Sequence, residues 1–248
     1  MMRPLSLLYG ILSYCIFFAT FLYAIGFVGG LVVPKGIDSG ERASLPTSLA
    51  INIGLLSVFA VQHSVMARPA FKGWWTRFVP QAVERSTYVL ASSIALLLLF
   101  WLWRPMTTIV WDIEPAPARL AVWGLFWLGW LTVLVATFLI NHFDLFGLRQ
   151  VYLFATGRPY TPVGFRTPAL HQVVRHPIML GFLIAFWAAP TMTAGHLLFS
   201  AVTTAYVLLA LQLEERDLVT FHGEDYRAYQ RQVRMLLPIP IRRDKQTS

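Results

Sequence analysis

The residues best suited to bind a small charged ligand flank one long apolar segment near the C-terminus. Arg175 and His176 come just before it, and Glu214 and Glu215 come just after it. Arginine and histidine can bind a carboxylate, and glutamate can accept hydrogen bonds from a ribose or an ammonium group. Two adjacent carboxylates at a membrane edge are costly unless paired or solvated, so they are functional candidates. The alternative is an ordinary helix end with a solvated acidic pair.

The apolar segment itself, residues 178–213, determines whether these residues meet. It is too long for one straight membrane span, and it is interrupted at Pro190 and again at Gly195 and His196. We therefore expect a hairpin of two antiparallel helices of equal length, each just long enough to cross the membrane. Such legs return both ends to the same membrane face. The sequence thus predicts that the cationic and anionic groups converge on one pocket.

Four earlier apolar segments are long enough to cross a bilayer, which takes about 20 residues as helix. They cover residues 5–29, 48–66, 86–103 and 120–140. Only 13% of the residues are charged and 56% are hydrophobic, whereas soluble domains have about 25% charged residues. We predict a single all-α domain over residues 1–248: a polytopic membrane helix bundle with four long transmembrane helices plus a C-terminal helical hairpin. No strand pattern is visible.

The basic residues predict how the bundle is oriented. Four of the twenty, Lys35, Arg42, Arg104 and Arg119, fall in loops on one side, and sixteen fall on the other. The positive-inside rule then places both termini in the cytoplasm. Anionic lipid headgroups explain the net charge of +8, so a nucleic-acid partner is not expected. The single cysteine, Cys15, excludes a disulfide or a cysteine-based metal site within one chain, and no metal site is predicted.

Residues 141–177 and 214–240 are expected to form a cofactor pocket on the cytoplasmic side. The first of these segments mixes polar and aromatic residues, which favours an amphipathic interfacial helix followed by a polar pocket wall. A loop that faces the headgroups is the alternative. A dinucleotide-binding fold is excluded, because no glycine-rich loop follows a strand.

The C-terminal half resembles the membrane methyltransferase superfamily of isoprenylcysteine carboxyl methyltransferase. The motifs that carry the resemblance are Asn141-His142, Arg175-His176-Pro177, Glu214-Glu215-Arg216-Asp217-Leu218, Tyr226, Tyr229 and Leu237-Pro238. The chain has Ala169 and His171 where that superfamily usually has Gly and Tyr. The resemblance implies S-adenosylmethionine as cofactor, S-adenosylhomocysteine as product, and an acceptor that arrives from the membrane. The implied cofactor-binding residues are His171, Gln172, Val174, Arg175, His176, Pro177, Glu214, Glu215, Tyr226 and Tyr229.

The N-terminal half is similar to the NnrU-like branch of this superfamily. The similarity lies in Gln62 to Pro69, Phe71 to Trp75, Glu84 to Tyr88 and Trp103 to Pro105. Residues 141–150 resemble the methanethiol S-methyltransferases of that branch. The resemblance implies methylation of methanethiol, a small volatile thiol, to dimethyl sulfide in a bacterial inner membrane. Another small thiol, an isoprenylcysteine carboxylate or a lipid amine are alternative acceptors.

Methyl transfer from a sulfonium to a thiolate joins a cation and an anion into neutral products, so a dry site favours it. A cysteine-like thiol has a pKa of about 8.5, so neutral pH leaves little thiolate. His142 and His171 are candidate bases, and Arg149 or Arg175 could stabilise the thiolate. Asn141 is grouped with them as a catalytic candidate.

Three further residues are assigned to the substrate pocket. They are His63, Tyr160 and Phe146. His63 either lines that pocket or makes a packing hydrogen bond within the bundle. A non-enzymatic haem or quinone carrier is the competing class, although no two histidines form an evident facing pair within apolar helices. The sequence leaves the oligomeric state open.

Overall fold

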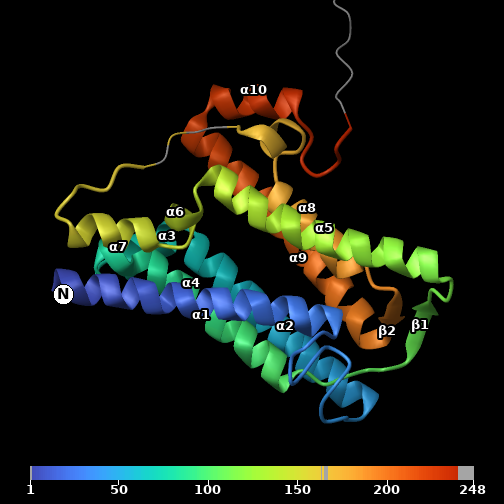
Figure 1. Cartoon of the computed structure of the whole chain (residues 1–248). Helices are drawn as coiled ribbons and strands as arrows, with labels where there is room; N and C mark the ends of the chain where they lie inside the picture. The colour runs from blue at the N-terminus through green and yellow to red at the C-terminus, as the bar shows by residue number, and fades with distance from the viewer. Residues whose placement is uncertain (1, 163, 165–166, 240–248) are drawn as a thin grey trace, which may run out of the picture.

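The protein is a helical bundle in a computed structural model that describes residues 2–162, 164 and 167–239 (Figure 1). Five helices in this part are long and apolar enough to cross a membrane. They are α1 (Arg3–Gly29), α2 (Leu45–Ala67), α4 (Gln81–Leu102), α5 (Ala116–Ile140) and α9 (Ala194–His222). The chain is an integral membrane protein, as the composition predicts.

The first four long helices confirm the four apolar segments, with longer bounds. The largest difference is in α4, which begins at Gln81 rather than at residue 86. Its first turn contains Gln81 and Glu84, and the acidic side chain suits the positive end of the helix dipole. A prediction from hydropathy alone places the start of the helix later, because the apolar pattern begins only after Arg85.

Aromatic side chains fill the centre of the bundle. Phe27 of α1 packs against Phe100 of α4, with ring centroids 4.7 Å apart, and both are almost fully buried. Between α5 and α8 (Pro177–Trp187) the backbones themselves touch. A side chain at Gly181 would lie 2.7 Å from the carbonyl oxygen of Gly129, so the close approach requires glycine.

The C-terminal hairpin differs from the prediction. Its legs are unequal, because α8 has 11 residues and α9 has 29. At 1.5 Å per residue α8 is about 16 Å long, too short to cross alone. The prediction that the segment is interrupted at Gly195 and His196 is also wrong. Both residues lie in the first turn of α9, where Thr193 accepts a hydrogen bond from the backbone N–H of His196. The extended residues 188–193 add the length that α8 lacks, so the two ends of the hairpin still meet.

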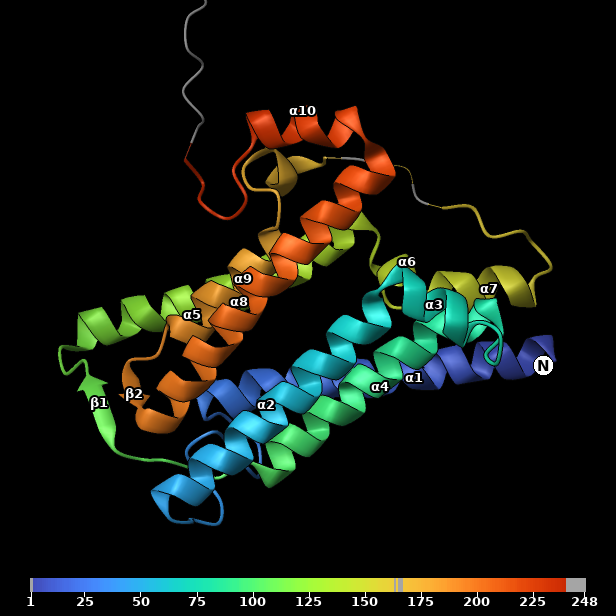
Figure 2. The same cartoon turned by 180° about the vertical axis from the view of Figure 1, so that it is seen from behind.

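A small sheet corrects the prediction that the chain has no strands. β1 (Ile109–Asp112) pairs antiparallel with β2 (Thr191–Thr193). Such short strands carry no readable alternation, and their pairing joins distant parts of the chain. The sheet lies at the opposite end of the bundle from α10 (Glu224–Gln232) (Figure 2).

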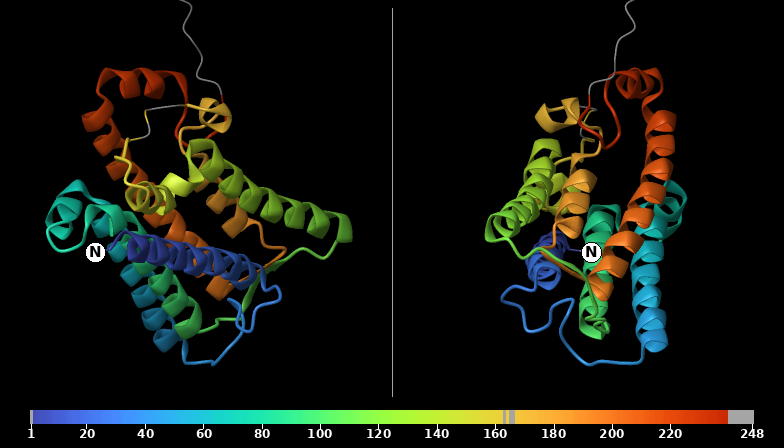
Figure 3. Two further views of the ribbon diagram at one scale, coloured as in Figure 1. Left: turned by 60° about the vertical axis from the view of Figure 1, so that its left-hand side comes forward. Right: turned by 90° about the vertical axis from the view of Figure 1, so that its right-hand side faces the viewer.

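The shortest helices gather at the end of the bundle that lies away from the sheet. They are α3 (Pro69–Trp75), α6 (His142–Leu145), α7 (Leu148–Ala155), the 3-10 helix η1 (Ala169–Gln172) and α10. α7 lies along α1 and α4 (Figure 1), and its Val151 is fully buried. Residues 141–177 thus contain two short α-helices, α6 and α7, and an interfacial position for them stays a prediction. The long α9 runs beside α2 and carries α10 beyond it (Figure 3).

Candidate functional site

Arg175 and Glu215, which lie 40 residues apart in the sequence, form a two-pronged ion pair. Nε of Arg175 lies 2.6 Å from Oε1 of Glu215, and its Nη2 lies 2.8 Å from Oε2. The Arg175 side chain is 10% exposed and that of Glu215 is 15% exposed. The predicted convergence of the two hairpin ends is therefore confirmed by direct contact.

Glu215 is the centre of a larger cluster. Its carboxylate also accepts hydrogen bonds from His176 Nε2 (3.1 Å), Tyr226 Oη (3.3 Å) and Gln230 Nε2 (2.9 Å). We call these five residues, Arg175, His176, Glu215, Tyr226 and Gln230, the Glu215 cluster. It joins the start of α8, the end of α9 and α10.

The C-terminal tail after α10, residues 233–239, packs on this cluster through backbone hydrogen bonds. Arg175 donates its backbone N–H to the carbonyl of Arg234 at 2.9 Å, and His176 donates to Met235 at 3.1 Å. Arg175 Nη1 donates to the carbonyls of Gln230 and Val233. The terminal guanidinium donors are therefore engaged inside the protein.

Glu214 differs from its neighbour. Its side chain is 47% exposed, and His176 Nδ1 is 3.9 Å from its carboxylate. The two adjacent carboxylates thus have separate environments: Glu215 is buried and paired, while Glu214 is open to a ligand. A hollow of about 400 Å³ adjoins the cluster between α9 and α10, and is lined by Gln212, Glu215, Arg216, Val219, Thr220 and Gln230.

His171 is buried in η1, with 8% of its surface exposed. Its Nδ1 lies 3.3 Å from the carbonyl oxygen of Pro168, so Nδ1 carries the proton. Burial lowers the pKa of His171, which keeps the ring neutral. Nε2 is then a free lone pair, and no described residue donates to it.

The backbone around His171 is held in an unusual shape. Ala169 has φ of +37°, in the left-handed region that favours glycine. This conformation accounts for the glycine that the superfamily pattern has at this position. Tyr229 of α10 donates its hydroxyl to the carbonyl oxygen of His171, and burial raises the pKa of Tyr229 to about 12.

His142 is buried in a different place and has both nitrogens engaged. Thr137 Oγ1 donates to the carbonyl oxygen of Leu134 at 2.7 Å, so it must accept from His142 Nδ1 at 2.9 Å. Nε2 then accepts from the hydroxyl of Tyr14 at 2.8 Å. The ring stacks on Phe138 at 4.2 Å, and burial lowers the pKa of His142.

Arg149 of α7 links α6 to the segment that follows α7. It donates to Asp144 Oδ1 (2.8 Å), to the carbonyl oxygen of Thr161 (2.8 Å) and to Thr161 Oγ1 (2.9 Å). Tyr160 reaches the other oxygen of Asp144 at 3.3 Å, and its ring lies 5.3 Å from the Arg149 guanidinium. Asn141 caps α6 by accepting from the backbone N–H of Asp144. We call these five residues the Asp144 cluster.

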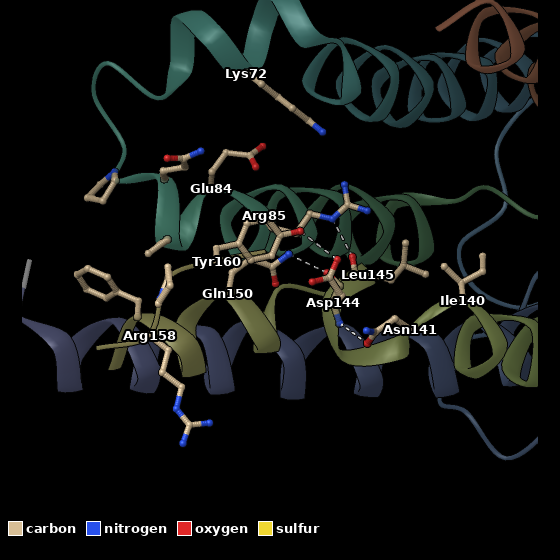
Figure 4. Close-up of a pocket in the computed structure, with 15 residues that line it drawn as sticks. Lys72, Glu84, Arg85, Ile140, Asn141, Asp144, Leu145, Gln150, Arg158 and Tyr160 are labelled. Carbon is tan, nitrogen blue, oxygen red and sulfur yellow. Dashed lines mark hydrogen bonds between the residues drawn. The ribbon is translucent and has the colours of Figure 1, made fainter. Parts of the chain in front are cut away.

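The Asp144 cluster faces a cavity of about 740 Å³ between α4, α6, α7 and α3 (Figure 4). Its walls are Lys72, Pro80, Gln81, Ala82, Glu84, Arg85, Ile140, Asn141, Asp144, Leu145, Gln150, Phe154, Arg158, Pro159 and Tyr160. Asn141, a catalytic candidate, and Tyr160, a substrate-pocket candidate, therefore line this cavity, and their roles stay predictions. Among the described residues, no hydrogen bond or ion pair joins this cluster to the Glu215 cluster.

The other two residues assigned to the substrate pocket lie inside the bundle, and neither is among the walls of this cavity. His63 contacts Tyr88 Oη at 2.9 Å through Nε2 and Ser92 Oγ at 3.1 Å through Nδ1, which is the packing interpretation of this residue. Phe146 stacks on Phe17 at 3.9 Å. His196, at the hairpin turn, bonds to the carbonyl oxygen of Phe186.

Sequence reasoning missed two contributors. Gln230 lies one helical turn after Tyr226, and the i, i+4 spacing places both on the same face of α10. That signal could have found it. Tyr14 is one of several hydroxyl residues in α1, and only the packing of α1 beside α6 brings it to His142.

Together the fold and these clusters define an integral membrane protein whose helices carry two polar clusters at one end. A sequence profile described as NnrU protein matches residues 51–235. The chain belongs to the NnrU family, as the sequence motifs predict.

Several relatives resemble most of the chain. A methanethiol S-methyltransferase of Mycobacterium tuberculosis is 59% identical over 242 residues, which are 98% of this chain and 99% of the relative. One of Crocosphaera subtropica is 54% identical over 95% of this chain and 92% of its own length. Nurim of Mus musculus is 31% identical over 72% of this chain and 71% of its own length. No solved structure matches the chain.

Proposed function

We propose that this protein is an enzyme that methylates methanethiol to dimethyl sulfide with S-adenosylmethionine as the methyl donor. The near-full-length similarity to methanethiol S-methyltransferases supports the reaction and the acceptor. The observation that carries the proposed site is the meeting of Arg175 and His176 with Glu214 and Glu215 at one end of the bundle.

The residues at this end fit the donor. Glu214 offers an exposed carboxylate to an ammonium group or to ribose hydroxyls. The adjoining hollow of about 400 Å³ is within the range of small-molecule sites. We assign the cofactor site to His171, Gln172, Val174, Arg175, His176, Pro177, Glu214, Glu215, Tyr226 and Tyr229. When bound, S-adenosylmethionine supplies a methyl group on a positively charged sulfur.

Within that set, the hydrogen bonds suggest a division of roles. Arg175 is satisfied by Glu215 and by the tail carbonyls, so we assign Arg175 and Glu215 to holding the site together. Glu214 is the member that we expect to contact the ligand directly. This arrangement keeps a buried charge pair neutral and leaves one carboxylate available.

His171 is the group that we propose accepts the thiol proton. Its ring is neutral, its Nδ1 proton is directed to Pro168, and its Nε2 lone pair is free. His142 lacks this freedom, because Tyr14 and Thr137 occupy both nitrogens. We therefore assign His142, Asn141 and Arg149 to positioning the segment of residues 141–161 that leads to η1.

The water-soluble donor requires that this end of the bundle face the cytoplasm. Sixteen of the twenty basic residues fall on this side by the loop count, which supports that orientation. The bacterial relatives support an inner-membrane location. The small apolar thiol would then reach the site from the bilayer.

The reaction is tested with purified protein and S-adenosylmethionine. The acceptors are methanethiol, ethanethiol, an isoprenylcysteine and a lipid amine, and the readouts are S-adenosylhomocysteine and the methylated product. We expect dimethyl sulfide from methanethiol at the highest kcat/KM. A higher kcat/KM for either of the last two acceptors would contradict the proposal.

A further inference from the structure

Two cationic side chains, Lys72 and Arg85, extend into the 740 Å³ cavity and have no ion-pair partner among the described residues. Nζ of Lys72 has no hydrogen bond to any described residue. Arg85 donates Nε to the carbonyl oxygen of Leu145 at 2.8 Å, and its terminal nitrogens donate to no described residue. Figure 4 shows the ammonium of Lys72 and the guanidinium of Arg85 extending toward the same gap, while Arg158 points away from it.

Converging like charges are unfavourable unless an anion lies between them. Burial and the charge of Arg85 lower the pKa of Lys72, and the charge of Glu84 opposes this shift only in part. Asp144 does not compensate them, because Arg149 already pairs with it. Glu84 lines the same cavity but lies in no ion pair within the described part of the chain.

The cavity also has acceptors without donors. Oε1 of Gln150 is buried and has no hydrogen-bond partner among the described residues, whereas its Nε2 donates to the carbonyl oxygen of Asp144. The carboxylate of Glu84, which also lines the cavity, is a second acceptor. A ligand that fits this wall carries an anionic group for the cations and hydroxyl donors for Gln150 and Glu84.

The neighbouring helix α3 lies where a lipid headgroup can reach the cavity. Phe71, Trp74, Trp75 and Phe78 pack together, with centroids 5.4–5.9 Å apart. The side chains of Trp74 and Phe78 are nevertheless 48% and 70% exposed. Aromatic side chains of this kind mark the headgroup level of a bilayer.

We propose that this cavity binds the headgroup of an anionic phospholipid, with its phosphate between Lys72 and Arg85 and its hydroxyls on Gln150 and Glu84. The site is separate from the Glu215 cluster and goes beyond the proposed methyl transfer. The same phosphate chemistry could come from free inorganic phosphate, which the experiment separates.

The test measures thermal unfolding of the full chain in detergent while phosphatidylglycerol, phosphatidylcholine or inorganic phosphate is added. A ligand that binds the folded state raises the unfolding temperature. We expect a saturable rise with phosphatidylglycerol alone. An equal rise with phosphatidylcholine, or with inorganic phosphate at the same concentration, would overturn the proposal.

The variants identify the site. Lys72→Gln should weaken apparent phosphatidylglycerol affinity about tenfold, as expected for one lost charge-assisted hydrogen bond. Lys72→Arg should retain most of it. Arg77→Gln, an exposed cation after α3 and outside the cavity walls, is the matched control and should behave like the wild type. Unchanged affinity in Lys72→Gln would overturn the site, and so would a loss of S-adenosylmethionine affinity with unchanged lipid binding.

Discussion

The guanidinium of Arg175 and the carboxylate of Glu215 meet through two parallel contacts of 2.6 and 2.8 Å. This pair joins Arg175, two residues before α8, to the last turns of α9, and α10 covers it with Tyr226 and Gln230. Because both side chains are largely buried, neither can lose its partner without leaving a charge in a poorly solvated place. The pair therefore fixes the geometry of the proposed donor site.

Glu215→Gln should destabilise the protein by about 3–5 kcal/mol, because it leaves Arg175 buried and unpaired. Arg175→Lys should also destabilise it, since lysine cannot reproduce the two-pronged contact. Thermal unfolding in detergent measures stability, and calorimetry with S-adenosylhomocysteine measures affinity, which should fall in both variants.

The control for these variants is Glu224→Gln in the same tail. Glu224 pairs with Arg231 at 2.6 Å, but both side chains are well exposed, and exposed ion pairs contribute little. A stability loss in Glu224→Gln equal to that in Glu215→Gln would contradict a special role for the buried pair.

His171→Ala should lower kcat/KM at pH 7 by about 100-fold or more, the usual contribution of a general base. Burial lowers the pKa of His171, so the wild-type ring is neutral at pH 7. Its activity should fall only as pH drops below the ordinary histidine range.

The activity of His171→Ala should depend on pH differently from that of the wild type. Without the base it depends on preformed thiolate, so its rate should rise about tenfold per pH unit below the pKa of the thiol. Equal pH profiles for the wild type and His171→Ala would refute the assignment. His142→Ala, measured alongside, should not acquire this dependence.

His142 should make stability depend on pH. Burial lowers its pKa in the folded state, so the unfolded chain binds a proton more readily. The stabilising contribution is therefore complete above the ordinary histidine pKa of about 6.5, and is lost as pH falls through the lowered folded pKa. The difference in unfolding temperature between wild type and His142→Gln should shrink from pH 7.5 to pH 5. A constant difference would contradict the buried neutral ring.

Ala169→Gly should stabilise the protein by about 0.5–1 kcal/mol. The left-handed φ of Ala169 costs about 1–2 kcal/mol for a residue with a Cβ, and part of this gain is offset by the greater freedom of glycine in the unfolded chain. Ala169→Val should destabilise it. If thermal unfolding placed the two variants in the opposite order, the conformation assigned to η1 would be wrong.

The sequence predicted the contact between Arg175 and Glu215 because it depends on local helix geometry and on the length of one apolar segment. It could not predict that Pro190 opens into strand β2, because β2 is stabilised by pairing with β1, about 80 residues away. It also could not rank His142 against His171. That distinction depends on Tyr14 and Thr137, whose hydroxyls reach His142 only after the helices pack.

The most direct measurement uses S-adenosylmethionine with a CD3 group on its sulfur, purified protein and methanethiol. The account predicts trideuterated dimethyl sulfide by mass spectrometry, formed in equal amount to S-adenosylhomocysteine and about 100-fold more slowly by His171→Ala at pH 7. Unlabelled dimethyl sulfide, or consumption of the donor without any labelled sulfide, would contradict it.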